Sequence, residues 1–374
     1  MTQLTSQINF FESTHPDLSD MLRARFDARQ VCLAGRGASA IYAVCRVIGY
    51  PGARIAIPSH ICPSVPQAVI RAGKRPWFLD IDPDDFNIDP RGLSKIPKDT
   101  AAIIAPHIYG HPLKIKEILE FCGNRGVVLI EDIAQAAGAT IDGREVGTFG
   151  DFAVMSFHPS KLIPGRGGGA LIASRRMSEY SSRIKSEFDQ LPESEPDYTV
   201  RSSQLTADVN RLLNLTRDGD ARENEIARLY MQNLDLIVQR KRNDTEIPNI
   251  VAMGALKESL KNRSERSNLY KELIKSKRIK HPSLTSGSPL FRYSIVIDGN
   301  DGPVLRKKIT ENLRAFGIHA SNLYYPAHLI FPDDTNAKLP HSEYVADRII
   351  NLWLDDSASE QYILKTAEII ENSI

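Results

Sequence analysis

Three short runs of mostly apolar residues lie close together near the middle of the chain, at residues 127–130, 152–157 and 170–173. Apolar runs of this length are typical of strands that are buried on both faces of a parallel sheet. Parallel strands need crossover connections, and these are usually helices that cover the sheet. This part of the sequence therefore predicts an α/β fold.

The N-terminal half shows the same alternation of strands and helices. Because each predicted strand ends at a glycine, a proline or a polar residue, we expect a binding site along one edge of the sheet, where open α/β sheets bind their ligands. The predicted strands are residues 31–34, 54–57, 77–80 and 101–105, and the helices are residues 40–48, 64–72 and 113–122.

Polar residues follow the three central runs. Asp132 follows the first, Lys161 follows the second, and a glycine-rich turn at residues 165–169 precedes the third. Pyridoxal phosphate needs an amine for a Schiff base, a carboxylate beside its ring nitrogen, and hydroxyl and backbone N–H groups around its phosphate. Lys161, Asp132, Ser156 and the glycines fit these needs. The alternative interpretation is a solvated lysine beside a turn whose glycines serve geometry alone.

The central segment resembles the DegT/DnrJ/StrS family of sugar aminotransferases. Further blocks similar to this family extend over most of the chain, except roughly residues 185–245. The motifs are Glu131-Asp132-x-Ala134-Gln135-x-x-Gly138-Ala139, Gly147-x-x-Gly150-Asp151, Ser156-Phe157-x-x-x-Lys161 and Gly168-Gly169-Ala170, and the further blocks are residues 51–59, 73–89, 106–110, 325–328 and 339–343.

The resemblance implies the type I fold of pyridoxal-phosphate-dependent aminotransferases. The chain has 374 residues, which by itself suggests two domains. We expect a large cofactor-binding domain at residues 1–246, with a divergent helical segment at about 185–245, and a smaller α+β domain at 247–374. The smaller domain is predicted from helices at 248–261, 263–279, 304–316 and 344–352 and from strands at 291–297 and 318–325.

The resemblance also implies a role for each central side chain. Lys161 would hold the cofactor and then act as the general base that moves the substrate proton. Asp132 would pair with the ring nitrogen, and Gln135 would donate a hydrogen bond near the ring oxygen. Ser156 would bind the phosphate.

A second part of the phosphate site is indicated by the glycine turn after residues 31–34. A strand, a glycine turn and a helix start together form an anion site. Gly37 and Ala38 stand where the family usually has a small hydroxyl residue before an alanine, so one side-chain hydroxyl is missing, and Ser39 is a candidate to replace it. A plain tight turn is the alternative.

Two departures from the family concern the cofactor ring and the phosphate. No aromatic residue stands near Cys62, where many members stack one on the ring, so either Cys62 or His60 is the candidate for that contact. No Asn-Tyr-Arg-like element, which reaches the partner subunit's phosphate, is found near residues 185–245. Arg201, Asn210 and Asn249 are weak substitutes.

The resemblance implies transfer of an amino group from L-glutamate to a keto sugar, most simply a nucleotide-linked one, by a homodimer. Tyr325 and His328 would lie near the substrate, although a packed aromatic residue and a surface histidine are the alternatives. Another ketone, such as an aminocyclitol precursor, remains open. So do a sugar dehydratase, against which Lys161 argues, and a catalytically silent relative with a binding or regulatory role.

Composition argues against several other classes of protein, namely nucleic-acid-binding, membrane and secreted proteins. With 47 basic and 46 acidic residues, the charge balance gives no reason to expect binding to nucleic acid or an anionic membrane. No apolar run approaches the roughly 18 residues of a membrane span, and no secretory signal is recognised. The four cysteines are far apart and form no CxxC motif, so neither a disulfide framework nor a metal site is expected, and a cytoplasmic location is.

Overall fold

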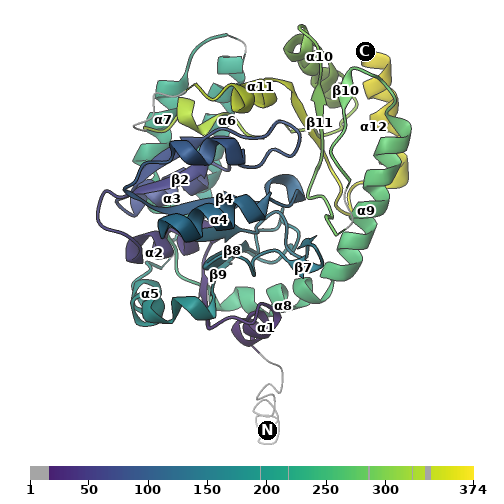
Figure 1. Cartoon of the computed structure of the whole chain (residues 1–374). Coiled ribbons are helices and arrows are strands. Elements are labelled where there is room, and N and C mark those ends of the chain that lie inside the picture. Colours follow the sequence, from purple (N-terminus) through teal and green to yellow (C-terminus); the bar gives the residue numbers. More distant parts are fainter. Residues whose placement is uncertain (1–16, 194, 218, 285–286, 322, 333–337) are drawn as a thin grey trace, which may run out of the picture.

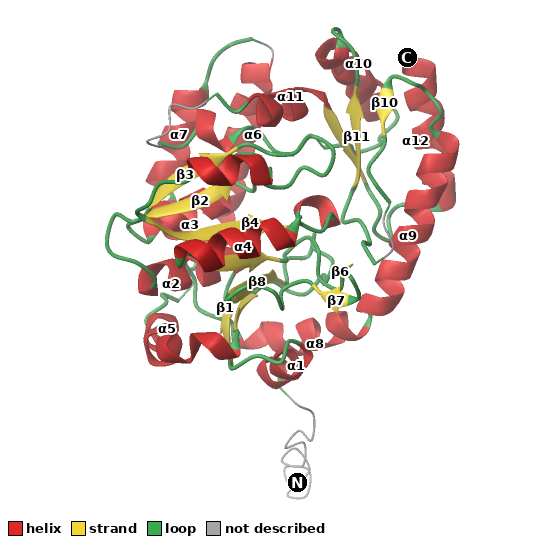
Figure 2. Ribbon diagram, viewed as in Figure 1, coloured by secondary structure: helices red, strands yellow, loops and turns green. Residues whose placement is uncertain are grey.

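The computed structural model describes residues 17–193, 195–217, 219–284, 287–321, 323–332 and 338–374. Within these residues the chain forms a seven-stranded sheet, a three-stranded sheet and a two-stranded hairpin. Figures 1 and 2 show the large sheet at the centre and the three-stranded sheet above it and to the right. Helix α9 runs along the right-hand side of the molecule in this view.

The large sheet has the strand order β1-β9-β8-β5-β4-β2-β3. The strands from β8 to β3 pair in parallel, whereas β9 is antiparallel to both of its neighbours. The mostly parallel sheet is thus confirmed, and β9 is reversed because a glycine-rich turn rather than a crossover helix joins it to β8. The strands are β1 (Gln30–Ala34), β2 (Arg54–Pro58), β3 (Arg75–Leu79), β4 (Thr100–Pro106), β5 (Val128–Asp132), β8 (Phe152–Ser156) and β9 (Gly169–Ala173). The hairpin strands are β6 (Thr140–Ile141) and β7 (Arg144–Glu145).

Helices cover both faces of this sheet. Successive side chains of β2 point to opposite faces of the sheet: Ile55 and Ile57 pack in one core cluster and Ala56 packs in another. Each fully buried aliphatic side chain of this kind contributes about 1.5–3 kcal/mol. On the Ile55 side lie α2 (Gly37–Val47), α3 (Ser64–Arg71), α5 (Ser181–Asp189), α6 (Tyr198–Arg217) and α7 (Glu223–Gln232). On the other side lie α1 (Leu18–Arg25) and α4 (Ile115–Arg125).

The smaller sheet is antiparallel, with β11 between β10 and β12. It shares a core cluster with residues of α9, α10 and α12. Gly317 has a positive φ of 71° and ends α10, as its position predicts. The elements are α9 (Leu256–Leu273), β10 (Ile279–Lys280), β11 (Tyr293–Ile297), α10 (Gly302–Ala315), α11 (Pro340–Arg348), β12 (Ile349–Leu352) and α12 (Glu360–Ser373).

Two predicted elements of this region are wrong. The helix predicted over residues 344–352 ends at Arg348, and Ile349–Leu352 is strand β12, which is buried against β11. The strand predicted over residues 318–325 is absent from its described residues, apart from an isolated bridge between Ser321 and Asn351. In both cases packing against β11 or the large sheet overrides the local preference.

The two helices predicted over residues 248–261 and 263–279 are present with different bounds. Helix α8 (Glu246–Gly254) ends at Ala255, and α9 follows directly but stops at Leu273, six residues before β10. Gly254 weakens a helix at this point. The N-terminus of α8 contacts α1, where the Leu18 N–H donates to Glu246 Oε1 at 3.1 Å. The predicted domain boundary after residue 246 stays a prediction.

Candidate active site

Strand β5 delivers two carboxylates to the edge of the large sheet, and they point to opposite sides because strand side chains alternate. Glu131 is fully buried. It accepts hydrogen bonds from the N–H groups of Gly147, Phe149 and Gly150 at 2.6–2.8 Å and from His107 Nε2 at 3.2 Å. Glu131 therefore holds the turn before β8 and is not free for chemistry.

Asp132 is half-buried, and its Oδ1 accepts a hydrogen bond from the Ala134 N–H at 3.0 Å. Burial raises the pKa of Asp132 above its usual value, while the Ala134 N–H and the charge of Lys161 oppose the rise. Strands β5 and β8 are parallel neighbours, so the strand ends that carry Asp132 and lead to Lys161 lie at the same edge of the sheet. The structure thus brings together the acid and the amine that the sequence indicated.

Lys161 lies beyond the end of β8, in a tight turn closed by a hydrogen bond from its N–H to the His158 carbonyl at 2.8 Å. Its side chain is half-buried, and Nζ lies 5.2 Å from the centre of the Phe291 ring. Phe291 precedes β11, so the amine lies where the large sheet meets the smaller one. A cation over an aromatic face is held by about 0.5–2 kcal/mol, which restricts where the amine points.

The first turn of α2 lies against the β8–β9 hairpin. A Cβ on Gly37 would be 3.3 Å from Ser156 Cβ, and a Cβ on Gly169 would be 2.3 Å from the Gly37 nitrogen. The N-cap residue Arg36 makes no side-chain capping hydrogen bond within the described chain. Gly37, Ala38 and Ser156 are therefore neighbours at a helix N-terminus that suits an anion.

Ser39 does not supply the missing hydroxyl. Its side chain is fully buried, and its Oγ donates to the Ile237 carbonyl at 2.9 Å and accepts from the Gln239 N–H at 2.9 Å. The hydroxyl is thus used to fix the segment after α7 to α2. The expectation that Ser39 could serve the phosphate is wrong for this reason.

Gln135 is held by aromatic residues from two distant segments. Its Oε1 accepts from the Tyr109 N–H at 3.1 Å, and its Nε2 donates to the Tyr324 hydroxyl at 2.9 Å. The rings of Tyr109 and Tyr324 lie parallel, with their centres 6.1 Å apart. Sequence reasoning gave neither tyrosine a role, although Tyr109 stands in a block that resembles the family.

His60 and Cys62, the two candidates for a ring contact, have different surroundings. His60 is fully buried, and its Nε2 lies 3.0 Å from the Tyr109 hydroxyl. Burial lowers the pKa of His60 to about 3, so the ring is neutral and is packed among aromatic residues. Cys62 is half-buried, and its Sγ lies 3.0 Å from Ser64 Oγ.

Tyr325 and His328 lie on one segment that packs against the large sheet. The Tyr325 hydroxyl donates to Glu223 of α7 at 2.6 Å. His328 Nδ1 lies 2.7 Å from the hydroxyl of Ser59, just after β2, and its Nε2 lies 3.3 Å from Glu343 of α11. The ring of His328 is therefore buried, with a polar contact at each of its two nitrogens, unlike the ring of a surface histidine.

The three candidate substitutes for the missing Asn-Tyr-Arg-like element differ in their contacts. Arg201 is paired with Glu195 at 3.0 Å and Asp235 at 2.6 Å, and Asn210 is exposed. Only Asn249 reaches the segment that carries Lys161, through the glycine-rich turn.

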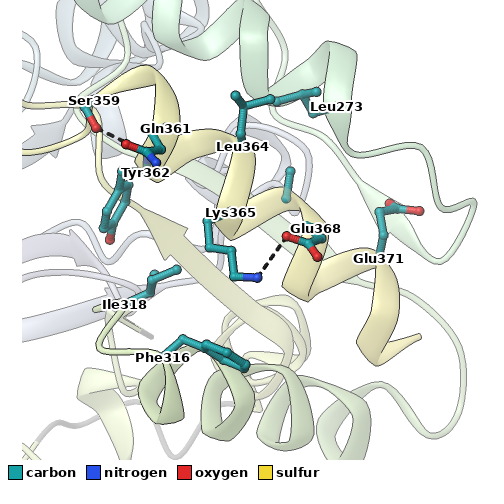
Figure 3. A pocket seen from close by; sticks show the side chains of 11 residues that line it. Leu273, Phe316, Ile318, Ser359, Gln361, Tyr362, Leu364, Lys365, Glu368 and Glu371 are labelled. Atoms are coloured by element: carbon teal, nitrogen blue, oxygen red, sulfur yellow. Dashed lines mark hydrogen bonds and ion pairs between the residues drawn. The ribbon is translucent and has the colours of Figure 1, made fainter.

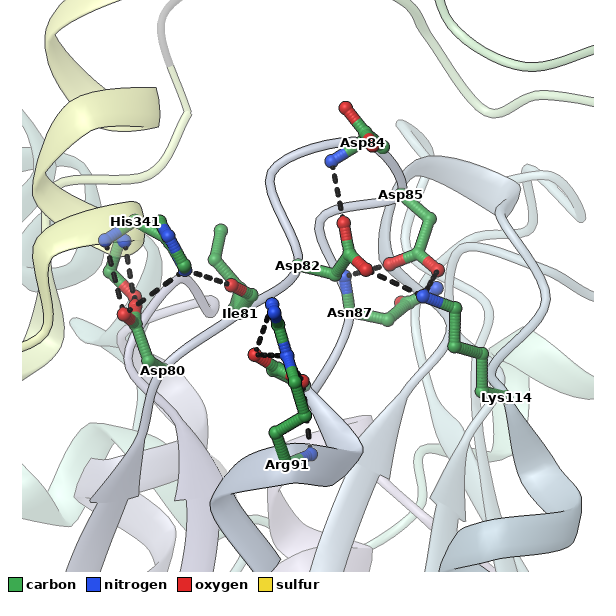
Figure 4. A network of polar contacts seen from close by, with 11 residues as sticks. Asp80, Ile81, Asp82, Asp84, Asp85, Asn87, Arg91, Lys114 and His341 are labelled. Carbon is green, nitrogen blue, oxygen red and sulfur yellow. Dashed lines mark hydrogen bonds and ion pairs between the residues drawn. The ribbon is translucent and has the colours of Figure 1, made fainter.

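Two other features lie away from these residues. A cavity of about 750 Å³ is lined by residues of α12, the end of α9 and the turn after α10, and none of them is a predicted site residue (Figure 3). A polar network after β3 includes Asp82 and Asp85, whose carboxylates lie 2.5 and 3.7 Å from Lys114 Nζ (Figure 4).

Among the described residues no group of three or more His, Cys, Asp or Glu side chains is placed to hold a metal ion. In the same residues no helix is long and apolar enough to cross a bilayer.

The family model for the DegT/DnrJ/EryC1/StrS aminotransferases matches residues 17–235. The chain belongs to this family. It is therefore a pyridoxal-phosphate-dependent aminotransferase, and the family predicted from the motifs is confirmed.

Individual relatives agree with this assignment. The chain is 25% identical to dTDP-4-dehydro-2,3,6-trideoxy-D-glucose 4-aminotransferase from Saccharopolyspora spinosa, over 93% of this chain and 85% of the relative. It is 24% identical to UDP-N-acetyl-3-dehydro-alpha-D-glucosamine 3-aminotransferase from Acidithiobacillus ferrooxidans, over 87% and 78% of the two chains. The fold matches that of E. coli GDP-4-keto-6-deoxy-D-mannose-3-dehydratase, solved with bound hydrated PLP, with a TM-score of 0.69, 18% identity and coverage of 94% and 90%. The type I fold is thereby confirmed.

Proposed function

We propose that this aminotransferase moves an amino group from L-glutamate to the carbonyl carbon of a keto sugar linked to a nucleotide. Both relatives described above act, by their names, on keto sugars carrying a nucleotide. The observation that carries the proposal is geometric: Asp132 ends β5 and Lys161 follows β8, two parallel neighbouring strands, so both lie at one edge of the sheet, beside an uncapped helix N-terminus. An acid, an amine and an anion site within one edge match the three needs of pyridoxal phosphate.

The residues fit the cofactor in the following way. Its phosphate would lie at the first turn of α2, against Gly37, Ala38 and Ser156, where the helix dipole favours a negative charge. Asp132 would face the ring nitrogen. Its raised pKa in the free protein would fall beside a positive charge.

Gln135 and Cys62 complete the proposed cofactor contacts. The Gln135 amide is hydrogen-bonded to the Tyr109 N–H and the Tyr324 hydroxyl, so it is held in one orientation, in which it would face the cofactor ring. Cys62 would place its polarisable sulfur against the ring.

The cofactor supplies an electron sink for the substrate carbon. Lys161 Nζ would act as the general acid–base group that accepts and then donates the proton of the reacting carbon, as expected of a positioned amine. Asp132 would keep the ring nitrogen protonated. Tyr325 and His328, held by Glu223 and Ser59, would line the substrate side of this site.

We further propose a homodimer and a cytoplasmic location. Helix α8 has an apolar exposed face, on which Ile247 and Val251 are 76% and 67% exposed. Apolar side chains one turn apart on an exposed face favour burial by a second copy. The four cysteines are free, as expected in a reducing compartment.

The test is a transamination assay on the cofactor-loaded protein with L-glutamate and dTDP- and UDP-linked 3-keto and 4-keto hexoses. Mass spectrometry should detect an aminated sugar with at least one acceptor, and borohydride reduction followed by peptide mapping should place the cofactor on Lys161. Lys161→Ala should abolish amination. Label on another lysine, or amination by the Lys161→Ala variant, would refute the role of Lys161. Amination of none of these sugars would refute the proposed substrate class.

A further inference from the structure

The glycine-rich turn between Lys161 and β9 is held from outside by one buried side chain. Asn249 of α8 is 2% exposed. Its Oδ1 accepts a hydrogen bond from the Arg166 N–H at 3.2 Å, and its Nδ2 donates to the Gly167 carbonyl at 3.0 Å. One amide therefore satisfies both a donor and an acceptor of the turn backbone.

The turn is shaped to admit this side chain. A Cβ on Gly165 would lie 1.8 Å from Asn249 Oδ1, so only glycine allows the amide to approach. Gly167 and Gly168 have φ values of 98° and 103°, a region that other residues rarely adopt. Glycines also leave a turn with many competing conformations, and two hydrogen bonds to a buried side chain select one of them.

This turn borders both halves of the proposed site. On one side it leads back to Lys161, and on the other it leads to Gly169, which packs against the Gly37 peptide at the start of α2. A shift of the turn would therefore move the amine relative to the anion site. Displacements of about 1 Å can cost on the order of a hundredfold in rate.

We infer that Asn249 is a positioning residue, which fixes the 165–168 turn and thereby the placement of Lys161 relative to the α2 N-terminus. The inference rests on the proposed roles of Lys161 and of the α2 N-terminus. The Asn249 amide makes both of these hydrogen bonds to the turn backbone, so its effect passes through the turn.

Asn249→Ala and Asn249→Asp test this inference, with Asn268→Ala on the exposed surface of α9 as the matched control. Hydrogen exchange of the cofactor-free protein is measured first. Exchange of the peptide that contains Arg166 should accelerate on the order of tenfold in Asn249→Ala, as expected for lost hydrogen bonds of about 1 kcal/mol each. Peptides from β4 and α12 should not change. Asn249→Asp keeps the acceptor and loses the donor, so its exchange should be intermediate.

The cofactor-loaded variants are then compared by the pH midpoint of the visible absorbance band and by kcat and KM. Asn249→Ala should shift the midpoint and lower kcat more than it changes KM, whereas Asn268→Ala should match the wild type. Local exchange that stays unchanged would overturn the inference. So would faster exchange with an unchanged midpoint and kcat, because Asn249 would then be only structural. If Asn249→Ala does not fold, Asn249→Asp decides by the same criteria. A wild-type protein without a visible band would refute the proposed function instead, and the exchange data would still show whether Asn249 holds the turn.

Discussion

Glu131 and Asp132 are adjacent, yet their surroundings give them different roles. Glu131 accepts four hydrogen bonds in a fully buried site, whereas Asp132 is half-buried near Lys161. His107 Nδ1 accepts from the Leu113 N–H at 3.2 Å, so the proton of a neutral His107 ring lies on Nε2 and points to Glu131. The motif that both acids share therefore combines a structural residue and a proposed catalytic one.

Asp132→Asn should keep the fold and lose most of the activity. An amide cannot hold the ring nitrogen protonated, so we expect kcat to fall roughly a hundredfold or more, as when a preorganised electrostatic partner is removed. Steady-state kinetics on protein loaded with saturating cofactor is the measurement. Asp142→Asn, at an exposed ion pair, is the control, and near wild-type turnover in Asp132→Asn would refute the role.

Glu131→Gln should destabilise the protein by about 3 kcal/mol, because its NH₂ group would face backbone N–H donors and leave buried groups unsatisfied. Urea unfolding measures the loss. Glu120→Gln, at an exposed position of α4, should change stability by no more than about 0.5 kcal/mol. An equal effect of the two substitutions would contradict the structural role of Glu131.

The same site predicts a pH dependence. Burial raises the pKa of Glu131, but the His107 hydrogen bond and the Gly147 and Gly150 N–H groups outweigh it, so the pKa in the folded protein is lowered. Its stabilisation is then present above the unfolded pKa of about 4.3 and is lost as the pH falls through the folded value. The stability gap between wild type and Glu131→Gln should therefore narrow below about pH 4, and a gap that widens would show the opposite shift.

Among the elements, α8 has two contrasting faces. Asn249 and Met253 are buried, and Asn249 holds the glycine-rich turn. Ile247 and Val251 face outward. A helix that is apolar on its exposed face is unusual in a monomer, and this one lies directly behind the lysine segment. Assembly through α8 would thus stabilise the element that positions the proposed site.

Ile247→Glu combined with Val251→Glu should weaken the proposed dimer roughly a hundredfold or more, since buried charges at the centre of an interface are costly. Light scattering over a range of concentrations is the measurement. Val304→Glu on α10, where Val304 is 73% exposed, should leave the association unchanged. A wild-type protein that is monomeric at all concentrations would refute the dimer itself.

At the scale of the whole molecule, the site lies where the two sheets meet. The Phe291 N–H donates to the Tyr109 carbonyl at 2.7 Å, Gln135 donates to Tyr324, and Lys161 lies over Phe291. A second connection is Asp80 at the end of β3, which accepts from the N–H groups of His341 and Ser342 at the start of α11 (Figure 4). These contacts fix one sheet to the other around the lysine.

Asp80→Ala should cost about 1–2 kcal/mol, because the first turn of α11 loses the acceptor of its N–H groups. Denaturant unfolding measures the loss, and Ser342→Ala should be partly non-additive with it, since the Ser342 hydroxyl donates to the same carboxylate at 2.9 Å. Coupling of at least about 0.5 kcal/mol is expected for groups in direct contact. Full additivity would show that Asp80 does not hold α11.

The sequence by itself predicted the large, mostly parallel sheet, which the structure confirms, and it contains the acid, the lysine and the glycine turn in that order. These follow from local apolar runs and a linear motif, which are read from neighbouring residues. Only the tertiary structure decided that the Ser39 hydroxyl is hydrogen-bonded to the backbone of residues 237–239. It also decided that Ile349–Leu352 is a strand and that Asn249 is hydrogen-bonded to the turn that follows Lys161. Each of these depends on a partner that is distant in the chain, and the chemistry of a single residue does not reveal which partner folding will bring to it.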